Sequence, residues 1–180
     1  MNKVLLFNPR SAVAKHRIPN SLMNIVASIE GVFDWMIVDG NREEDAYKKL
    51  RSFLSTGQYK YLGITVMPGP QTKQAIPFSK KIKEEFPSVV IIWGGYFPTS
   101  HYKVILQSGY VDFVINGPGD RAFPQLIDAL ENDKPYELIK NLIYKSGDTI
   151  MKTIKDDLIE QDELPPLPYD KLNKIYSIEW

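Results

Sequence analysis

The 180-residue sequence has no cysteine, only two histidines and no long hydrophobic run. Without cysteine, the chain cannot form a disulfide, a thiolate zinc site or a cysteine-ligated iron–sulfur cluster. The apolar segment at residues 4–7 ends at Asn8-Pro9 and is too short for a signal peptide or a membrane-spanning helix. We therefore expect a cytoplasmic protein with no membrane partner.

An excess of charge of either sign is also absent, because 22 basic residues balance 22 acidic ones. A chain without net charge lacks the long-range field that attracts nucleic acid, so no nucleic-acid partner is expected. The sequence does have 43% apolar residues, which is enough to bury the core of one domain.

Short apolar segments alternate with amphipathic ones along the first 130 residues. Strands are expected at 3–7, 33–38, 61–66, 89–93 and 111–115, and helices at 21–29, 43–54, 71–86, 99–107 and 122–130. Parallel strands joined by helical crossovers form a sheet that is covered on both faces. The sequence thus predicts an α/β fold: a flavodoxin-like, doubly wound, five-stranded parallel sheet in the order 2-1-3-4-5.

The pattern changes after the fifth helix. Residues 142–145 and 149–152 flank Ser146-Gly147-Asp148 and predict a C-terminal β-hairpin. A proline-rich arm follows at residues 162–168 and is expected to be extended. We therefore divide the chain into a domain at residues 1–135 and a hairpin with a proline-rich linker at residues 136–180.

Two of the expected strands end in glycine-containing loops. The fourth runs into Gly94-Gly95-Tyr96-Phe97-Pro98 and the fifth into Asn116-Gly117-Pro118-Gly119. The carboxyl ends of parallel strands meet at one edge of the sheet, where this fold binds ligands, and glycine lets a ligand approach the backbone. The loops after the first and third strands add Asn8, Pro9, Arg10, Thr65, Val66, Met67 and Gln71 to this candidate site.

Some of these residues also suit roles without a ligand. Gly94 and Gly95 are compatible with close packing of a helix on the sheet, and Tyr96 and Phe97 with a protein interface. Residues required by several ligands of this fold are missing: no acidic pair follows the first strand, and there is no GxGxxG. A hydrolase or transferase is not supported, because no nucleophile–base pair is evident.

Several motifs occur in a characteristic order. They are the segment 4–9, Leu62-Gly63-Ile64-Thr65, Trp93-Gly94-Gly95 with Pro98-Thr99, the segment 111–120, and the segment 164–170. In their order and spacing, the whole chain resembles the N-terminal cobalamin (vitamin B12)-binding domain of cobalamin-dependent radical S-adenosylmethionine (SAM) enzymes.

The resemblance implies where the cofactor would bind. The corrin ring would lie over the carboxyl end of the sheet. Its nucleotide tail would run along Thr65, Val66 and Met67, beside Gly94, Gly95 and Tyr96. Residues 116–119 would form the other wall of the groove. Relatives carry Gly-Glu-Gly-Glu where this chain has Gly117-Pro118-Gly119-Asp120, so Pro118 removes a carboxylate and an amide donor.

The resemblance also implies the state of the cofactor and the partner. Related mutases and methionine synthases place a histidine of an Asp-x-His-x-x-Gly loop on cobalt, but His16 lacks that context. Cobalamin is therefore expected base-off, without a histidine or other metal ligand from the protein.

SAM and the [4Fe-4S] cluster would belong to a radical SAM catalytic domain, in the same longer chain or a separate subunit. The family's CxxxCxxC motif is not in this chain, which would not catalyse methyl transfer or rearrangement alone. The alternative is a degenerate flavodoxin-like interaction domain that docks a partner without binding corrin.

Overall fold

The structure, a computed structural model, describes residues 2–12, 18–156 and 164–172. Its first ten elements alternate between strand and helix, as the sequence pattern predicts. They are β1 (Lys3–Asn8), α1 (Asn20–Ile29), β2 (Trp35–Asp39), α2 (Ala46–Leu54), β3 (Tyr59–Thr65), α3 (Thr72–Glu85), β4 (Val90–Gly94), α4 (Tyr96–Gln107), β5 (Phe113–Ile115) and α5 (Ala122–Glu131). The hairpin strands β6 (Leu142–Ser146) and β7 (Thr149–Lys152) and the short helix α6 (Tyr169–Leu172) follow.

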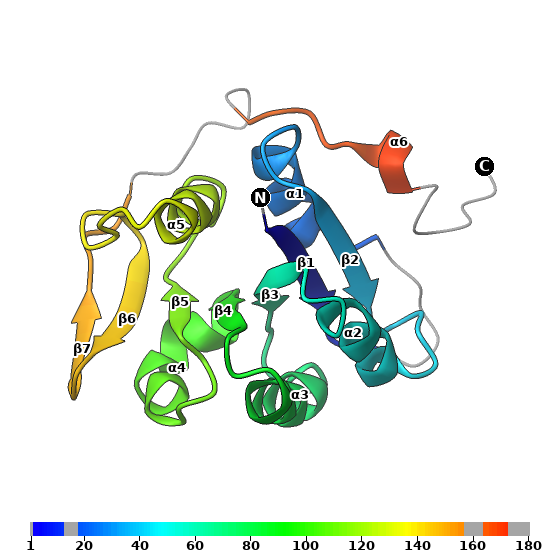
Figure 1. Cartoon of the computed structure of the whole chain (residues 1–180), viewed down its shortest axis with the longest axis horizontal. Coiled ribbons are helices and arrows are strands. Elements are labelled where there is room, and N and C mark those ends of the chain that lie inside the picture. Colours follow the sequence, from blue (N-terminus) through cyan, green and yellow to red (C-terminus); the bar gives the residue numbers. More distant parts are fainter. Residues whose placement is uncertain (1, 13–17, 157–163, 173–180) are drawn as a thin grey trace.

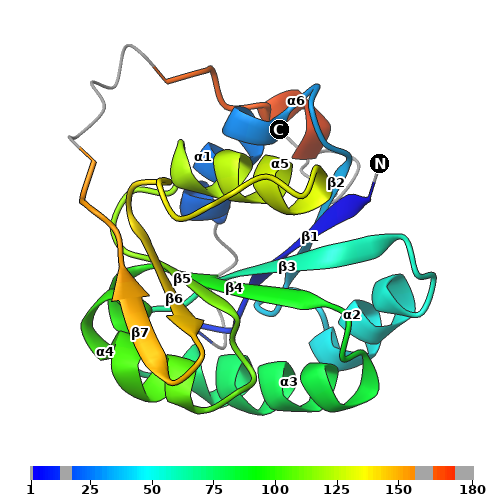
Figure 2. The same ribbon diagram turned by 60° about the vertical axis from the view of Figure 1, so that its left-hand side comes forward.

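The sheet separates two layers of helices (Figure 1). α1 and α5 cover one face, and α2, α3 and α4 cover the other, as Figure 2 also shows. Alternate strand residues serve the two cores: Leu6 packs with α1 and α5, whereas Phe7 packs with the opposite helices. This alternation on a doubly covered sheet explains why the strands are apolar at nearly every position.

The predicted five-stranded sheet is wrong in its extent. The five parallel strands lie in the expected relative order, but the whole sheet has seven strands in the order β2-β1-β3-β4-β5-β6-β7. The hairpin pairs with the sheet through β6, which runs antiparallel to β5 with Val114 opposite Ile143. Both faces of β6 are buried, since Leu142 and Tyr144 join one core and Ile143 the other.

Helix α4 begins earlier than predicted, at Tyr96 instead of Thr99. Its first turn therefore contains Tyr96, Phe97 and Pro98, which the sequence placed in a loop. Proline is tolerated there because the first amides of a helix have no partner within the helix. The glycine pair thus passes directly from strand into helix.

Residues 164–172, which include α6, lie on the α1 side of the molecule (Figure 2). Leu172 of α6 is fully buried in the core formed with α1 and α5, and Lys171 forms an ion pair with Glu30. The hydrogen bond from Lys171 lowers the pKa of Glu30 although burial opposes this, and the Trp35 indole donates to the same carboxylate at 2.6 Å. Residues 164–172 are therefore anchored to the domain.

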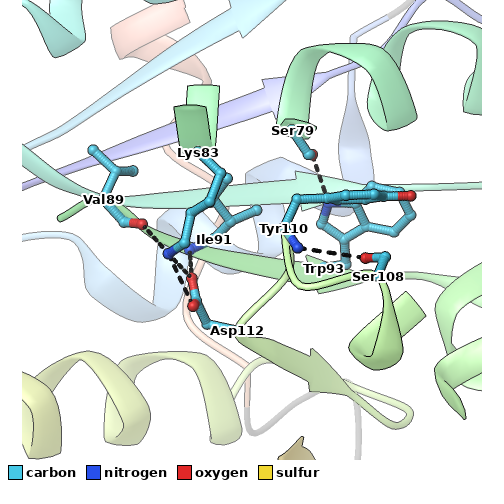
Figure 3. A network of polar contacts seen from close by, with 8 residues as sticks. All are labelled: Ser79, Lys83, Val89, Ile91, Trp93, Ser108, Tyr110 and Asp112. Carbon is cyan, nitrogen blue, oxygen red and sulfur yellow. Dashed lines mark hydrogen bonds and ion pairs between the residues drawn. The ribbon is translucent and has the colours of Figure 1, made fainter. Parts of the chain in front are cut away.

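A polar network ties together α3, β4 and β5 at the amino-terminal edge of the sheet (Figure 3). The Asp112 carboxylate accepts from Lys83 Nζ at 2.8 Å and from the backbone amide of Ile91 at 2.7 Å. Lys83 Nζ also donates to the Val89 carbonyl at 2.9 Å. One carboxylate thus connects a helix to the start of two strands.

We expect Asp112→Ala to lower the free energy of unfolding by about 1–3 kcal/mol, because the Ile91 amide and the Lys83 ammonium lose their shared partner. Urea denaturation measures the change. Asp148→Ala is the control: Asp148 is fully exposed and its contact to Lys145 is 3.6 Å long, so almost no effect is expected there. Equal unfolding midpoints for the two variants would contradict the role of the network.

Candidate ligand-binding pocket

A cavity of about 370 Å³ opens at the carboxyl-terminal side of the parallel strands, on the face covered by α1 and α5. Four strands and both helices contribute to its wall. The lining residues are Leu6, Ser21, Leu22, Asn24, Ile25, Gly63, Ile64, Thr65, Ile92, Gly94, Gly95, Ile115, Gly117, Pro118, Gly119, Asp120 and Phe123. The cavity lies at the edge where the fold and the glycine pattern predict a ligand.

Glycine shapes this cavity in two ways. At Gly63 and Gly119 it allows close packing: a Cβ on Gly63 would lie 2.9 Å from Phe123 Cε2, and one on Gly119 would lie 2.8 Å from Ile25 Cδ1. At Gly94 it leaves space, because the atom nearest to an added Cβ is Ile115 Cβ at 3.9 Å. Gly94 is thus the position where a side chain would enter the cavity instead of the protein.

Gly95 is required by the backbone. Its φ of 100° and ψ of −176° lie in a region that only glycine adopts readily. A Cβ there would lie 2.9 Å from the carbonyl oxygen of Val66 and 3.1 Å from its nitrogen. Glycine is therefore needed at these two neighbouring positions for different reasons: Gly94 leaves space in the cavity, and Gly95 allows the backbone conformation.

The cavity wall is largely apolar, with four polar side chains. Ser21 Oγ lies 3.4 Å from Thr65 Oγ1, so a hydroxyl pair joins α1 to the end of β3. Asn24 and Asp120 also line the cavity. Apolar walls with a few polar groups suit the burial of a mainly apolar ligand group that carries a few hydrogen-bonding atoms.

Some predicted site residues form a separate polar network that joins the loops. Asn8 donates to Asp39 at 2.9 Å, and Gln71 Nε2 donates to Asn8 Oδ1 at 3.1 Å and to the Pro9 carbonyl at 3.0 Å. The Arg10 side chain donates to the carbonyls of Gly40 and Glu43 at 2.7 and 2.8 Å. None of Asn8, Pro9, Arg10 and Gln71 lines the cavity.

The remaining predicted residues, Val66, Met67, Tyr96, Phe97 and Pro98, do not line the cavity. Met67 and Tyr96 are 50% and 66% exposed, whereas Val66 and Pro98 are buried. The Phe97 ring stacks on His101 at 4.5 Å between centroids. His16 lies outside the residues that the structure describes.

Asn116 is 1% exposed at the end of β5, between two residues of the cavity wall. Its Nδ2 is buried and has no hydrogen-bond partner within the described parts of the chain.

Six of the residues predicted for the site lie in the cavity wall. They are Thr65, Gly94, Gly95, Gly117, Pro118 and Gly119.

The sequence pattern did not reveal the contribution of the two helices. Ser21, Leu22, Asn24 and Ile25 of α1, with Phe123 of α5, form much of the cavity wall. The apolar residues of this set belong to the apolar faces of the two helices. The spacing of such residues in the sequence is the same whether they pack against the sheet or line a cavity. Only Gly63, a glycine inside a strand, carried a signal of close approach.

Metal-ligand clusters and membrane spans are both absent from the described segments. Within residues 2–12, 18–156 and 164–172, no three histidine or acidic side chains are grouped as metal ligands would be. In the same segments, no helix has the length and apolar character needed to cross a membrane.

No family model matches the sequence. The chain is 25% identical over 178 residues to an uncharacterized methyltransferase of Pyrococcus horikoshii. This alignment covers 94% of this chain and 39% of the methyltransferase. The chain is 30% identical over 80 residues to the anaerobic magnesium-protoporphyrin IX monomethyl ester cyclase of Synechocystis sp., covering 44% of this chain and 16% of the cyclase. The chain thus spans well under half the length of both relatives.

Solved structures share the fold. OxsB, a cobalamin-dependent SAM radical enzyme with aqua-cobalamin bound, matches with a TM-score of 0.82 and 16% identity over 97% of this chain and 25% of OxsB. TsrM of Kitasatospora setae, a radical SAM methyltransferase with cobalamin and a [4Fe-4S] cluster bound, matches with a TM-score of 0.74 and 17% identity over 86% of this chain and 31% of TsrM. The resemblance found in the sequence is confirmed: this chain has a fold that occurs in cobalamin-dependent radical SAM enzymes.

Proposed function

We propose that the chain is the cobalamin-binding module of a radical SAM enzyme of the methyl-transfer or rearrangement class. The observation that carries the proposal is the apolar cavity with glycine in its walls, at the ligand-binding edge of a fold shared with OxsB and TsrM. The cofactor would supply cobalt as a carrier of a transferable group. The protein would supply binding and orientation.

The cavity would hold the nucleotide tail of cobalamin. Gly94 gives the tail room beside β4, and Leu22, Ile25 and Phe123 present apolar surface to its flat base. Ser21 and Thr65 place hydroxyls where the tail's ribose could exchange hydrogen bonds. Asn116 would support the wall through its backbone amide, which donates to the Asn141 carbonyl at 2.7 Å.

The corrin ring would lie over the rim, against Met67 and Tyr96, with Phe97 and Pro98 in the first turn of α4 beneath it. Asn8, Pro9, Arg10 and Gln71 would support the site through the hydrogen bonds that fix the loops after β1 and β3. We propose base-off binding without a protein histidine on cobalt.

The catalytic partner would be a radical SAM domain that carries SAM and the [4Fe-4S] cluster, in the same longer chain or in a separate subunit. The 25% and 31% of OxsB and TsrM that the chain covers support this division. In this arrangement, residues 1–135 together with the β6–β7 hairpin, which extends their sheet, would form the cofactor domain, and the chain after the hairpin would lead toward the catalytic domain.

The test is retention of the cofactor. The chain is incubated with hydroxocobalamin, desalted, and measured by absorbance against protein concentration. We expect about one corrin per chain. A folded sample, verified by circular dichroism, that retains no corrin bands would overturn the proposal.

The second candidate is an interaction domain that binds no corrin. The exposed Tyr96 and Met67 favour it, because large apolar side chains at a rim also suit a protein partner. Retention of hydroxocobalamin near one equivalent would exclude this candidate.

A further inference from the structure

Asn141 connects the cavity wall to the hairpin. It directly precedes β6, is 4% exposed and has a φ of 60°, in the left-handed region that asparagine tolerates better than most residues. The sequence analysis placed this residue outside the cofactor domain, just before the predicted hairpin, whereas the structure buries it next to the loop between β5 and α5.

The backbone and side chain of Asn141 bind both ends of the turn at residues 116–118. Its carbonyl oxygen accepts from the Asn116 amide at 2.7 Å, and its Nδ2 donates to the Pro118 carbonyl at 3.2 Å. Gly117 lies between these two contacts: a Cβ built on it would be 3.8 Å from Asn141 Oδ1. Gly117, Pro118 and Gly119 form one wall of the cavity, so Asn141 touches that wall from outside.

The position of this wall needs an external support. Gly117 has a φ of 125° and no side chain that could pack against its surroundings. Pro118 has no backbone N–H to donate. The hydrogen bond from Asn141 Nδ2 holds the Pro118 carbonyl from outside the cavity.

Asn141 is in turn held by the segment that leaves β7. Asn141 Oδ1 accepts from the Asp156 amide at 2.9 Å, and the Asn141 amide donates to the Ile154 carbonyl at 3.0 Å. The Asp156 carboxylate lies 2.9 Å from Lys140 Nζ and 3.6 Å from a guanidinium nitrogen of Arg121 at the start of α5. The Asn141 side chain thus uses its donor toward Pro118 in the cavity wall and its acceptor toward Asp156 after β7.

We propose that Asn141 is a positioning residue for the cofactor: it sets the wall at residues 117–119 and thereby the affinity for the nucleotide tail. This inference rests on the proposed function, because it assigns the tail to the cavity. It adds that the β6–β7 hairpin, outside the cavity, controls how well the tail is held.

The test compares two ligands that differ in the tail. Cobalamin carries the nucleotide, and cobinamide is the same corrin without it. Asn141→Gly keeps the left-handed backbone accessible and removes both side-chain hydrogen bonds. We expect a cobalamin dissociation constant about tenfold higher than that of the wild type, with the cobinamide constant unchanged within about twofold.

Asp133→Gly is the matched control. Asp133 is also a non-glycine residue with positive φ, 49°, but it is exposed and does not line the cavity. Neither dissociation constant should change. Asn141→Asp keeps the acceptor for Asp156 and loses the donor to Pro118, so it should also weaken cobalamin selectively; it is the variant to measure if Asn141→Gly does not fold.

The outcomes separate the two proposals. A wild-type chain that binds no corrin, or that binds both ligands equally, overturns the assignment of the tail to the cavity. A wild-type chain that prefers cobalamin, with Asn141 variants that keep the same preference, overturns only the role of Asn141. Equal weakening of both ligands would also overturn it, because general loosening of the fold does not depend on the tail.

Discussion

Gly94→Leu is expected to abolish retention of cobalamin while leaving the fold intact. A Cβ at this position meets no atom closer than Ile115 Cβ at 3.9 Å, so the folded protein accepts a side chain there. The same Cβ points into the space that the nucleotide tail would need, and leucine adds further carbons to it. We expect the dissociation constant to rise on the order of 100-fold or more, equivalent to about 2.8 kcal/mol.

Absorbance titration with hydroxocobalamin measures the affinity, and thermal melting measures the stability. Gly94→Ala is the graded control: its single methyl group fits the open space, so its affinity should fall between those of the wild type and the leucine variant. If Gly94→Leu melts like the wild type and binds cobalamin with unchanged affinity, the tail does not occupy this cavity.

Gly95→Ala is expected to have the opposite profile, with a large loss of stability. The φ of 100° and ψ of −176° cost a residue with a Cβ about 1–3 kcal/mol. The Cβ would also lie 2.9 Å from the Val66 carbonyl oxygen. That backbone cannot easily yield, because the Val66 amide donates to Gly94 at 2.8 Å and the Val66 carbonyl accepts from Phe97 at 3.1 Å. We expect a total loss of about 3 kcal/mol or more.

Urea denaturation tests this expectation. Gly109→Ala is the matched control, since Gly109 also has positive φ, 77°, but an added Cβ there meets no atom within 4 Å. That variant should lose only about 1 kcal/mol, the cost of the backbone conformation alone. If the two alanine variants unfold at the same urea concentration, the contact with Val66 carries no energy and our account of Gly95 fails.

These two experiments separate residues that look equivalent in the sequence. Gly94-Gly95 predicts a close approach of something to the backbone, and the sequence left a ligand and a packed helix as alternatives. The structure gives the two residues different surroundings: Gly94 faces the cavity, where a ligand would have room, and Gly95 lies against the backbone of Val66, just after β3, and not against a helix. The dipeptide cannot reveal this, because the direction of each Cα–Cβ vector depends on dihedral angles set by the join between β4 and α4.

The hairpin shows where local patterns stop being informative about the fold. The strands at residues 142–146 and 149–152 and their turn were predicted closely, since alternation and turn residues are local signals. The pairing of β6 with β5 was missed, although the apolar run Leu142-Ile143-Tyr144 is typical of a strand buried on both faces. The tertiary structure makes the pairing evident, because Phe113, Tyr136 and Tyr144 pack against one another across it.

The sequence by itself determined the alternation of strands and helices and the edge that carries the candidate site. These follow from periodicity and from the helical crossovers that connect parallel strands. The order of the five parallel strands was expected by analogy with the flavodoxin-like fold, and the tertiary structure decided it. The tertiary structure decided which residues surround the cavity and which merely support it. Asn8 and Gln71 bind each other, whereas Ile25 and Phe123 line the cavity wall. The physical reason is that a cavity is a property of packing between distant segments, and Asn141 reaches its wall only because β6 joins the sheet.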